Sequence, residues 1–66
     1  MKFFLVWECY EEDFTLIQKG HHFLEVENPD SIDIEVGNYV EEMAKAREMN
    51  PFYIAITTCK PMPFNF

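Results

Sequence analysis

The stretch KFFLVWECY, residues 2–10, constrains the fold of this chain more than any other segment. Its aromatic and β-branched residues favour an extended strand. Alternation would place Phe3, Leu5, Trp7 and Cys9 on one face of that strand, and Phe4, Val6, Glu8 and Tyr10 on the other. Because apolar side chains occur on both faces, the strand is predicted to lie in the centre of a sheet, or at a subunit interface, with both faces covered.

Three further segments have the composition of strands. Residues 13–19 and 21–27 are predicted as the second and third strands, with Gly20 between them in a tight turn. Residues 52–59, FYIAITTC, are predicted as the last strand. An amphipathic helix is predicted over 39–49, ended by the Asn50-Pro51 pair.

The segment between residues 28 and 38 allows two interpretations. NPDS can form a β-turn that leads into a fourth strand over 32–36, where apolar and acidic residues alternate. Alternatively, Asn28 caps a helix that has Pro29 at its first position. Gly37 and Asn38 favour the strand, because both are poor in a helix interior while Asn38 is a good N-cap for the helix that follows.

The order of these elements predicts a single α+β domain over residues 1–66. It consists of an antiparallel sheet of about four to five strands with one helix packed across one face. A single helix cannot cover both faces, so the apolar, proline-containing tail over 61–66 or a second subunit is expected to cover the other face. Chains this short usually need a stabilising device such as oligomerisation. A homodimer is therefore favoured, with Met62, Phe64 and Phe66 in its interface.

The charge balance limits the classes of partner. The chain has twelve acidic residues against five Lys and Arg, with a net charge of -7. Such a chain repels phosphate backbones and anionic membrane surfaces, so neither direct nucleic-acid binding nor membrane binding is expected. A protein with a basic surface is the partner that this charge favours. No apolar run is long enough to cross a membrane, and two cysteines do not form a disulfide framework, so a cytoplasmic location is expected.

No motif for catalysis, metal binding or cofactor binding is apparent. His21, His22, Cys9 and Cys59 have the side chains of zinc ligands but not the spacing, since adjacent histidines on a strand point to opposite faces. The two glycines do not form a phosphate-binding loop. We therefore expect neither an enzyme nor a metal or cofactor site.

The acidic residues suggest a binding surface instead. If 22–27 and 32–36 pair as a hairpin, they would form an acidic ridge, with Trp7 and Tyr10 as aromatic anchors for a partner; the ridge residues of interest are Glu25, Glu27, Asp33 and Glu35. A compact acidic chain of this kind is similar, in kind only, to small viral proteins that inhibit host machinery. The favoured function is an inhibitor or adaptor that engages a basic protein surface.

A second function remains open at this stage. An oligomeric protein could bind or sequester a small molecule or nucleotide in a pocket between subunits. The candidate ligand-binding residues are Arg47, Tyr53, His21 and His22. Arg47 is the cation that the predicted helix would turn inward, where it would hold either a carboxylate or a ligand phosphate.

Overall fold

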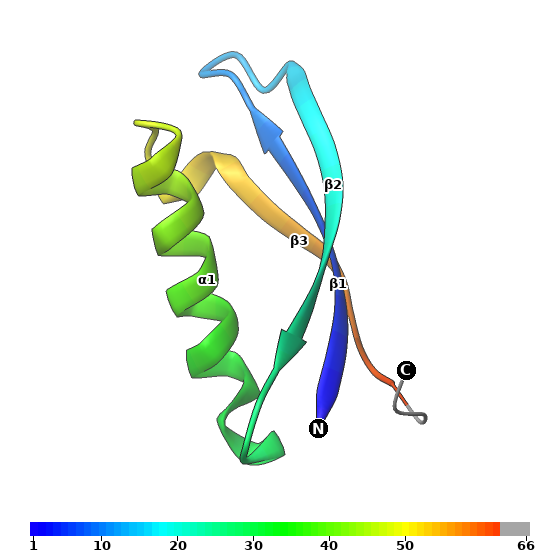
Figure 1. Ribbon diagram of the computed structural model, residues 1–66. Helices are drawn as coiled ribbons and strands as arrows, with labels where there is room; N and C mark the ends of the chain where they lie inside the picture. Colours follow the sequence, from blue (N-terminus) through cyan, green and yellow to red (C-terminus); the bar gives the residue numbers. More distant parts are fainter. Residues whose placement is uncertain (63–66) are drawn as a thin grey trace.

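The structure, a computed structural model, describes residues 1–62 (Figure 1). Its elements, in chain order, are strand β1 (Lys2–Tyr10), strand β2 (Leu16–Glu25), the 3-10 turn η1 (Pro29–Ser31), helix α1 (Ile32–Ala46), the 3-10 turn η2 (Pro51–Tyr53) and strand β3 (Ile54–Pro61). The three strands form one antiparallel sheet in the order β2-β1-β3. The predicted α+β class with an antiparallel sheet and one helix is thereby confirmed.

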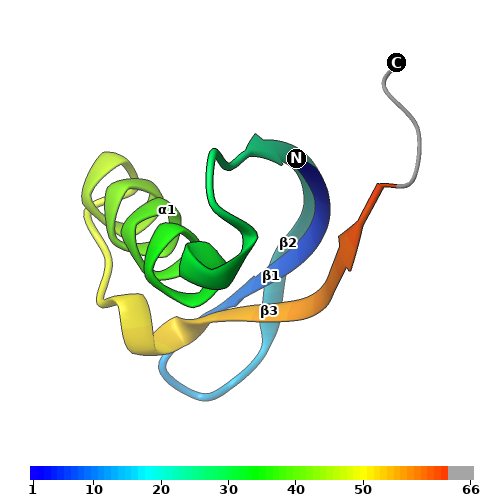
Figure 2. The same ribbon diagram turned by 90° about the horizontal axis from the view of Figure 1, so that it is seen from below.

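The sheet curves around the helix, so that α1 lies on its concave side (Figure 2). Alternate residues of β1 point into this space; Phe3, Leu5, Trp7 and Cys9 are all buried. Trp7 and Cys9 pack with Ala44 of α1 and Ile54 of β3, and partly buried residues of the helix surround them. The central position predicted for the first strand is therefore confirmed, and the core lies between β1 and the helix.

The two predicted strands on either side of Gly20 form one continuous strand, so the predicted turn at Gly20 is wrong. Gly20 lies within β2, directly opposite Trp7 of β1. A Cβ atom at Gly20 would lie only 2.8 Å from Cε2 of Trp7. The glycine is therefore explained by the close approach of the indole ring to the backbone, and it leaves the strand unbroken.

The predicted fourth strand over 32–36 is also wrong, because these residues form the first part of α1. The alternative interpretation identified the correct start signal: the Asn28 side chain accepts a hydrogen bond from the Asp30 amide, and Pro29 opens the 3-10 turn before the helix. Gly37 and Asn38 lie in the middle turns of α1, and both are exposed to solvent; a Cβ at Gly37 would meet nothing within 4 Å. The helix ends at Ala46, before the predicted end at residue 49.

The sheet face directed away from α1 is the open face. Its side chains come from alternate positions of the strands and include Phe4, Val6, His21 and Phe23. Phe23 is 47% exposed, and its ring lies 5.4 Å from that of Phe4. What covers this face remains a prediction, as two of the proposed interface residues, Phe64 and Phe66, lie outside the described residues.

The start of the predicted tail continues the sheet. Pro61 is the last residue of β3, and the Met62 amide donates a hydrogen bond to the Lys2 carbonyl at 2.8 Å. The first two residues of the predicted tail are therefore joined to the sheet through the backbone. The remaining part, 63–66, lies outside the described residues.

Candidate functional site

Two residues with left-handed backbone conformation lie at the same end of the molecule. Phe14 has φ 64° and Glu48 has φ 55°, and they are the only non-glycine residues with positive φ in the described part of the chain. Phe14 belongs to the loop between β1 and β2, and Glu48 follows α1; both segments lie at the top of Figure 1. Side chains with a Cβ disfavour this conformation, and such residues cluster at functional sites.

Local hydrogen bonds hold Phe14 in this conformation. The Phe14 amide donates to the Glu11 carbonyl at 2.8 Å, and the Glu11 amide donates to the Thr15 carbonyl at 2.9 Å. The Asp13 carboxylate accepts a hydrogen bond from the Thr15 amide at 3.0 Å. Hydrogen bonding from Thr15 lowers the pKa of Asp13, so this carboxylate keeps its charge. The loop thus fixes an exposed aromatic ring beside acidic residues.

Glu48 follows the C-cap residue of α1, Arg47, at the position that glycine most often occupies at helix ends. Its amide donates to the Lys45 carbonyl at 3.2 Å, and the Met49 amide donates to the Ala44 carbonyl at 2.9 Å. This pair of bonds is a Schellman motif, in which a glycine would adopt the left-handed conformation without strain. The chain instead places a charged side chain at this position.

Three aromatic rings meet at this end, and we call them the aromatic cluster: Phe14, Phe52 and Tyr53. The ring centroids of Phe14 and Phe52 are 6.1 Å apart, those of Phe14 and Tyr53 5.8 Å, and those of Phe52 and Tyr53 5.3 Å. Phe52 is 71% exposed and Phe14 62%. Large exposed apolar side chains that adjoin one another are typical of surfaces that contact a partner.

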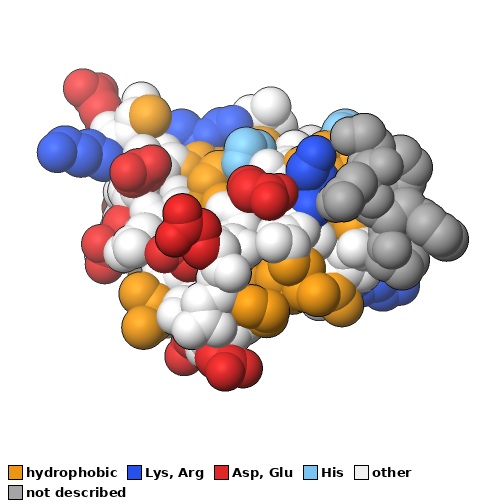
Figure 3. All heavy atoms as spheres, turned by 60° about the horizontal axis from the view of Figure 1, so that its bottom comes forward, with side chains coloured by type: hydrophobic (Ala, Val, Ile, Leu, Met, Phe, Trp, Pro, Cys, Tyr) orange, Lys and Arg blue, Asp and Glu red, His pale blue; other side chains and the backbone are white. Residues whose placement is uncertain are grey.

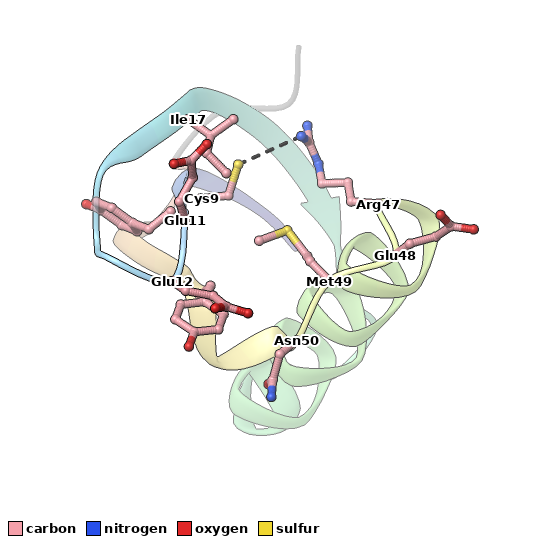
Figure 4. A pocket seen from close by; sticks show the side chains of 10 residues that line it. Cys9, Glu11, Glu12, Ile17, Arg47, Glu48, Met49 and Asn50 are labelled. Atoms are coloured by element: carbon pink, nitrogen blue, oxygen red, sulfur yellow. Dashed lines mark hydrogen bonds between the residues drawn. The ribbon is translucent and has the colours of Figure 1, made fainter.

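A hollow of about 500 Å³, here called the end hollow, lies next to the aromatic cluster and shares Tyr53 with it. It is formed between the β1–β2 loop and the segment after α1 (Figure 4). Its apolar surface comes from Cys9, Ile17 and Met49. The Met49 side chain points across the hollow toward the strands (Figure 4). Three acidic residues line it: Glu11, Glu12 and Glu48. The two ion pairs among residues 1–62 involve other carboxylates, Glu8 and Glu25.

Arg47 is the one basic residue of the end hollow, and its guanidinium is engaged within the protein. Its central carbon lies 4.8 Å from the centre of the Trp7 ring. One of its terminal nitrogens donates to Oε1 of Gln18 at 2.8 Å and lies 3.8 Å from Sγ of Cys9. Arg47 belongs to neither of the two ion pairs, so the lining carries three acidic residues against one guanidinium, with the Glu48 side chain pointing outward (Figure 4).

The predicted anchor residues Trp7 and Tyr10 have different locations. Trp7 is 7% exposed and forms part of the core, which removes it from the candidate partner-binding residues. Tyr10 is partly buried at the end of β1 and lines the end hollow. Its hydroxyl donates a hydrogen bond to the Glu8 carboxylate, and this bond raises the pKa of Tyr10.

The predicted acidic ridge is not formed, because its hairpin does not exist. Glu25 ends β2, Glu27 lies in the following loop, and Asp33 and Glu35 lie in the first turn of α1, where carboxylates stabilise the helix N-terminus. Glu25, Glu27 and Glu35 do line a shared hollow near the N-terminal end of α1. In Figure 3 the acidic side chains stand in separate groups with hydrophobic and uncharged side chains between them.

The alternative ligand-binding residues are only partly brought together. Arg47 and Tyr53 both line the end hollow. His21 lies on the open face with its ring 6.0 Å from that of Phe4, whereas His22 stacks on Tyr39 of α1 at 4.4 Å. Burial raises the pKa of Tyr39. The histidines therefore lie apart from the end hollow and from each other, on opposite faces of the sheet.

Sequence reasoning missed the residues that define this end of the molecule. The predicted second strand includes Phe14, and the predicted last strand begins at Phe52. The usual sequence signal of a left-handed residue is missing, because no glycine or asparagine occupies position 14 or 48. The Asp13-Phe14-Thr15 segment carries a weak signal for a turn, since an aspartate side chain that accepts a hydrogen bond from the backbone two residues later is typical of turns.

Comparison with known proteins gives no further guide to function. No family model matches the chain, and neither the curated proteins nor the solved structures contain a match. Within residues 1–62, no group of three His, Cys, Asp or Glu side chains is arranged to hold a metal ion. In the same residues, no helix has both the length and the apolar character needed to cross a membrane.

Proposed function

We propose that the chain is a small acidic protein-binding module, an inhibitor or adaptor, that engages a basic surface of a partner protein through the aromatic cluster and the end hollow. The observation that carries this proposal is the pair of left-handed residues, Phe14 and Glu48, at one end. Glycine would fit both positions with less strain, yet the chain places an exposed ring and a carboxylate there. Strain of this kind is explained when the side chains serve binding.

The distribution of charge supports a basic partner. By strand alternation and register, the open face carries three of the five basic side chains and two of the twelve acidic ones; these are Lys2, Lys19, Lys60, Glu8 and Glu25. The remaining ten acidic residues lie in the loops and in and around α1. Four of these ten, Glu11, Glu12, Asp13 and Glu48, lie in the β1–β2 loop and just after α1, so a partner that approaches the end hollow meets an excess of negative charge, which accelerates association with a positive surface. The net charge of -7 favours a protein over a nucleic acid.

We predict opposite effects on stability and on binding for Phe14→Gly and Glu48→Gly. Each substitution should relieve the Cβ penalty of the left-handed conformation, which for Glu48→Gly raises the free energy of unfolding by up to about 1 kcal/mol. For Phe14→Gly the gain is smaller, because the ring contacts with Phe52 and Tyr53 are lost. Each should weaken partner binding, by about tenfold or more for Phe14, as expected for an exposed aromatic contact residue. Urea denaturation measures the first effect, and peptide binding measures the second.

The partner class is tested by selection of a phage-displayed library of random peptides against the chain. We expect selected peptides enriched in Lys and Arg, and we expect the enrichment to disappear with the Phe14→Gly, Glu48→Gly double variant. Gly37→Ala is the matched control, since it stabilises an exposed helix position without touching this end. Selected peptides without a basic bias, or undiminished selection by the double variant, would contradict the proposal.

We further propose that a second copy of the chain covers the open face, in a cytoplasmic homodimer. The face combines exposed Phe23 with a nearly balanced set of charges, so two such faces can approach each other although the whole chain is strongly acidic. The free, exposed thiol of Cys59 suits a reducing compartment.

Light scattering tests this dimer. The full chain is expected to have twice the monomer mass, and Phe23→Glu is expected to halve that mass while circular dichroism remains unchanged. Truncation after Met62 keeps the hydrogen bond to Lys2 and tests the contribution of the tail. A full chain that is monomeric at high concentration would overturn the dimer and leave the proposed binding site unaffected.

A further inference from the structure

We infer that the end hollow and the aromatic cluster bind an arginine side chain of the partner. This inference rests on the proposed function and names the group that the site recognises. The two surfaces adjoin through Tyr53, which belongs to both. An incoming side chain that follows Tyr53 from the cluster into the hollow passes from aromatic faces to carboxylates.

The aromatic part of the site suits a guanidinium. The Phe14 and Phe52 rings are 62% and 71% exposed, so their surfaces are available to a ligand. Cations bind over aromatic faces, and arginine does so more often than lysine because its planar group also stacks. The chain uses the same contact internally, where the Arg47 guanidinium lies 4.8 Å from the Trp7 ring centre.

The polar part of the site selects a positive charge with several donors. Glu11 and Glu12 come from the β1–β2 loop and line the end hollow on that side, whereas the Glu48 side chain points away from the hollow (Figure 4). A guanidinium can donate to carboxylates from two of its edges, whereas an ammonium is a compact point charge. Arg47 forms neither of the two ion pairs among residues 1–62, and its single positive charge leaves the acidic residues of the lining in excess.

Isothermal titration with three matched peptides tests the inference. The probes are an acetylated Gly-Arg repeat, the same repeat with lysine, and the same repeat with citrulline, which keeps the shape of arginine but has no charge. The arginine peptide should bind about three- to tenfold more tightly than the lysine peptide, as expected when both stacking and bidentate bonding are lost. The citrulline peptide should bind most weakly.

Two variants separate the aromatic and acidic contributions. Phe52→Ser should weaken arginine binding about fivefold and remove most of the preference over lysine. The Glu11→Gln, Glu12→Gln pair should weaken arginine and lysine binding alike and reduce the dependence on salt. Ile34→Ser, which changes another exposed apolar residue, on α1, is the control and should leave all affinities unchanged.

Each outcome has a defined meaning. If lysine binds as tightly as arginine while Phe14→Gly still weakens binding, the arginine inference is wrong and the proposed function stands. The inference is also overturned if Phe52→Ser has no effect or if citrulline equals arginine. If none of the basic peptides binds, the proposed function itself fails.

Discussion

Trp7→Ala is expected to lower the free energy of unfolding by about 3 to 5 kcal/mol, the range found when large aromatic residues are removed from cores. Trp7 is 7% exposed and packs in the core with Cys9, Ala44 and Ile54. Its loss would also remove the surface on which Arg47 lies, leaving that guanidinium with fewer contacts. A domain of this length has a total stability of only about 3 to 10 kcal/mol.

The variant is therefore expected to be largely unfolded at room temperature or to melt far below the parent chain. Circular dichroism with urea denaturation measures the change. Ile34→Ala, at a position that is 62% exposed, provides the control and should change stability by less than about 0.5 kcal/mol. A Trp7→Ala chain as stable as the control would show that the indole is not part of the core.

Gly20→Val is expected to destabilise the chain by about 1 to 3 kcal/mol or more, because it forces atoms into a filled space. The Trp7 ring already lies where the new side chain would go, with Cε2 only 2.8 Å from an ideal Cβ position. The substitution would favour a strand on propensity alone, since valine is a better strand former than glycine. The sign of the effect therefore separates packing against Trp7 from intrinsic strand preference.

A double-mutant cycle identifies the cause. Trp7→Leu makes room for the new side chain, so Gly20→Val should cost less in the Trp7→Leu background than in the parent chain. Gly37→Ala is the matched control, because a methyl group there meets nothing within 4 Å and should stabilise by about 0.5 to 1 kcal/mol. If Gly20→Val stabilised the parent chain, the close approach of Trp7 and Gly20 would be contradicted.

The fold class could be predicted from the sequence because two segments have strong patterns. The first strand is apolar on both faces, and residues 39–46 repeat apolar side chains at helical spacing. The number of strands could not be predicted, because the sequence does not distinguish a glycine in a turn from a glycine within a strand that makes room for an aromatic ring. The helix start was misplaced because Gly37 and Asn38 disfavour helix locally, whereas the Asn28-Pro29 start and packing on the sheet outweigh that preference.

The candidate site depends on features that short-range patterns do not contain. Phe14 is distant in sequence from Phe52 and Tyr53, and all three lie in segments predicted as strands. Only the fold brings the β1–β2 loop, which carries Phe14, beside η2, which carries the other two. The left-handed conformations at Phe14 and Glu48 are set by hydrogen bonds within the loop and the helix end. The predicted acidic ridge is wrong for a related reason. It required residues 32–36 to pair as a strand with 22–27, whereas residues 32–36 form the start of α1.

We propose that a basic partner binds at the end of the molecule that carries the aromatic cluster and the end hollow. The most direct test of this proposal is a two-dimensional amide NMR titration of the chain with the Gly-Arg repeat peptide. The largest chemical-shift changes are expected in residues 10–17 and 47–53, and they should weaken as salt is added. Shift changes confined to the open face, or to the first turns of α1, would contradict the proposal.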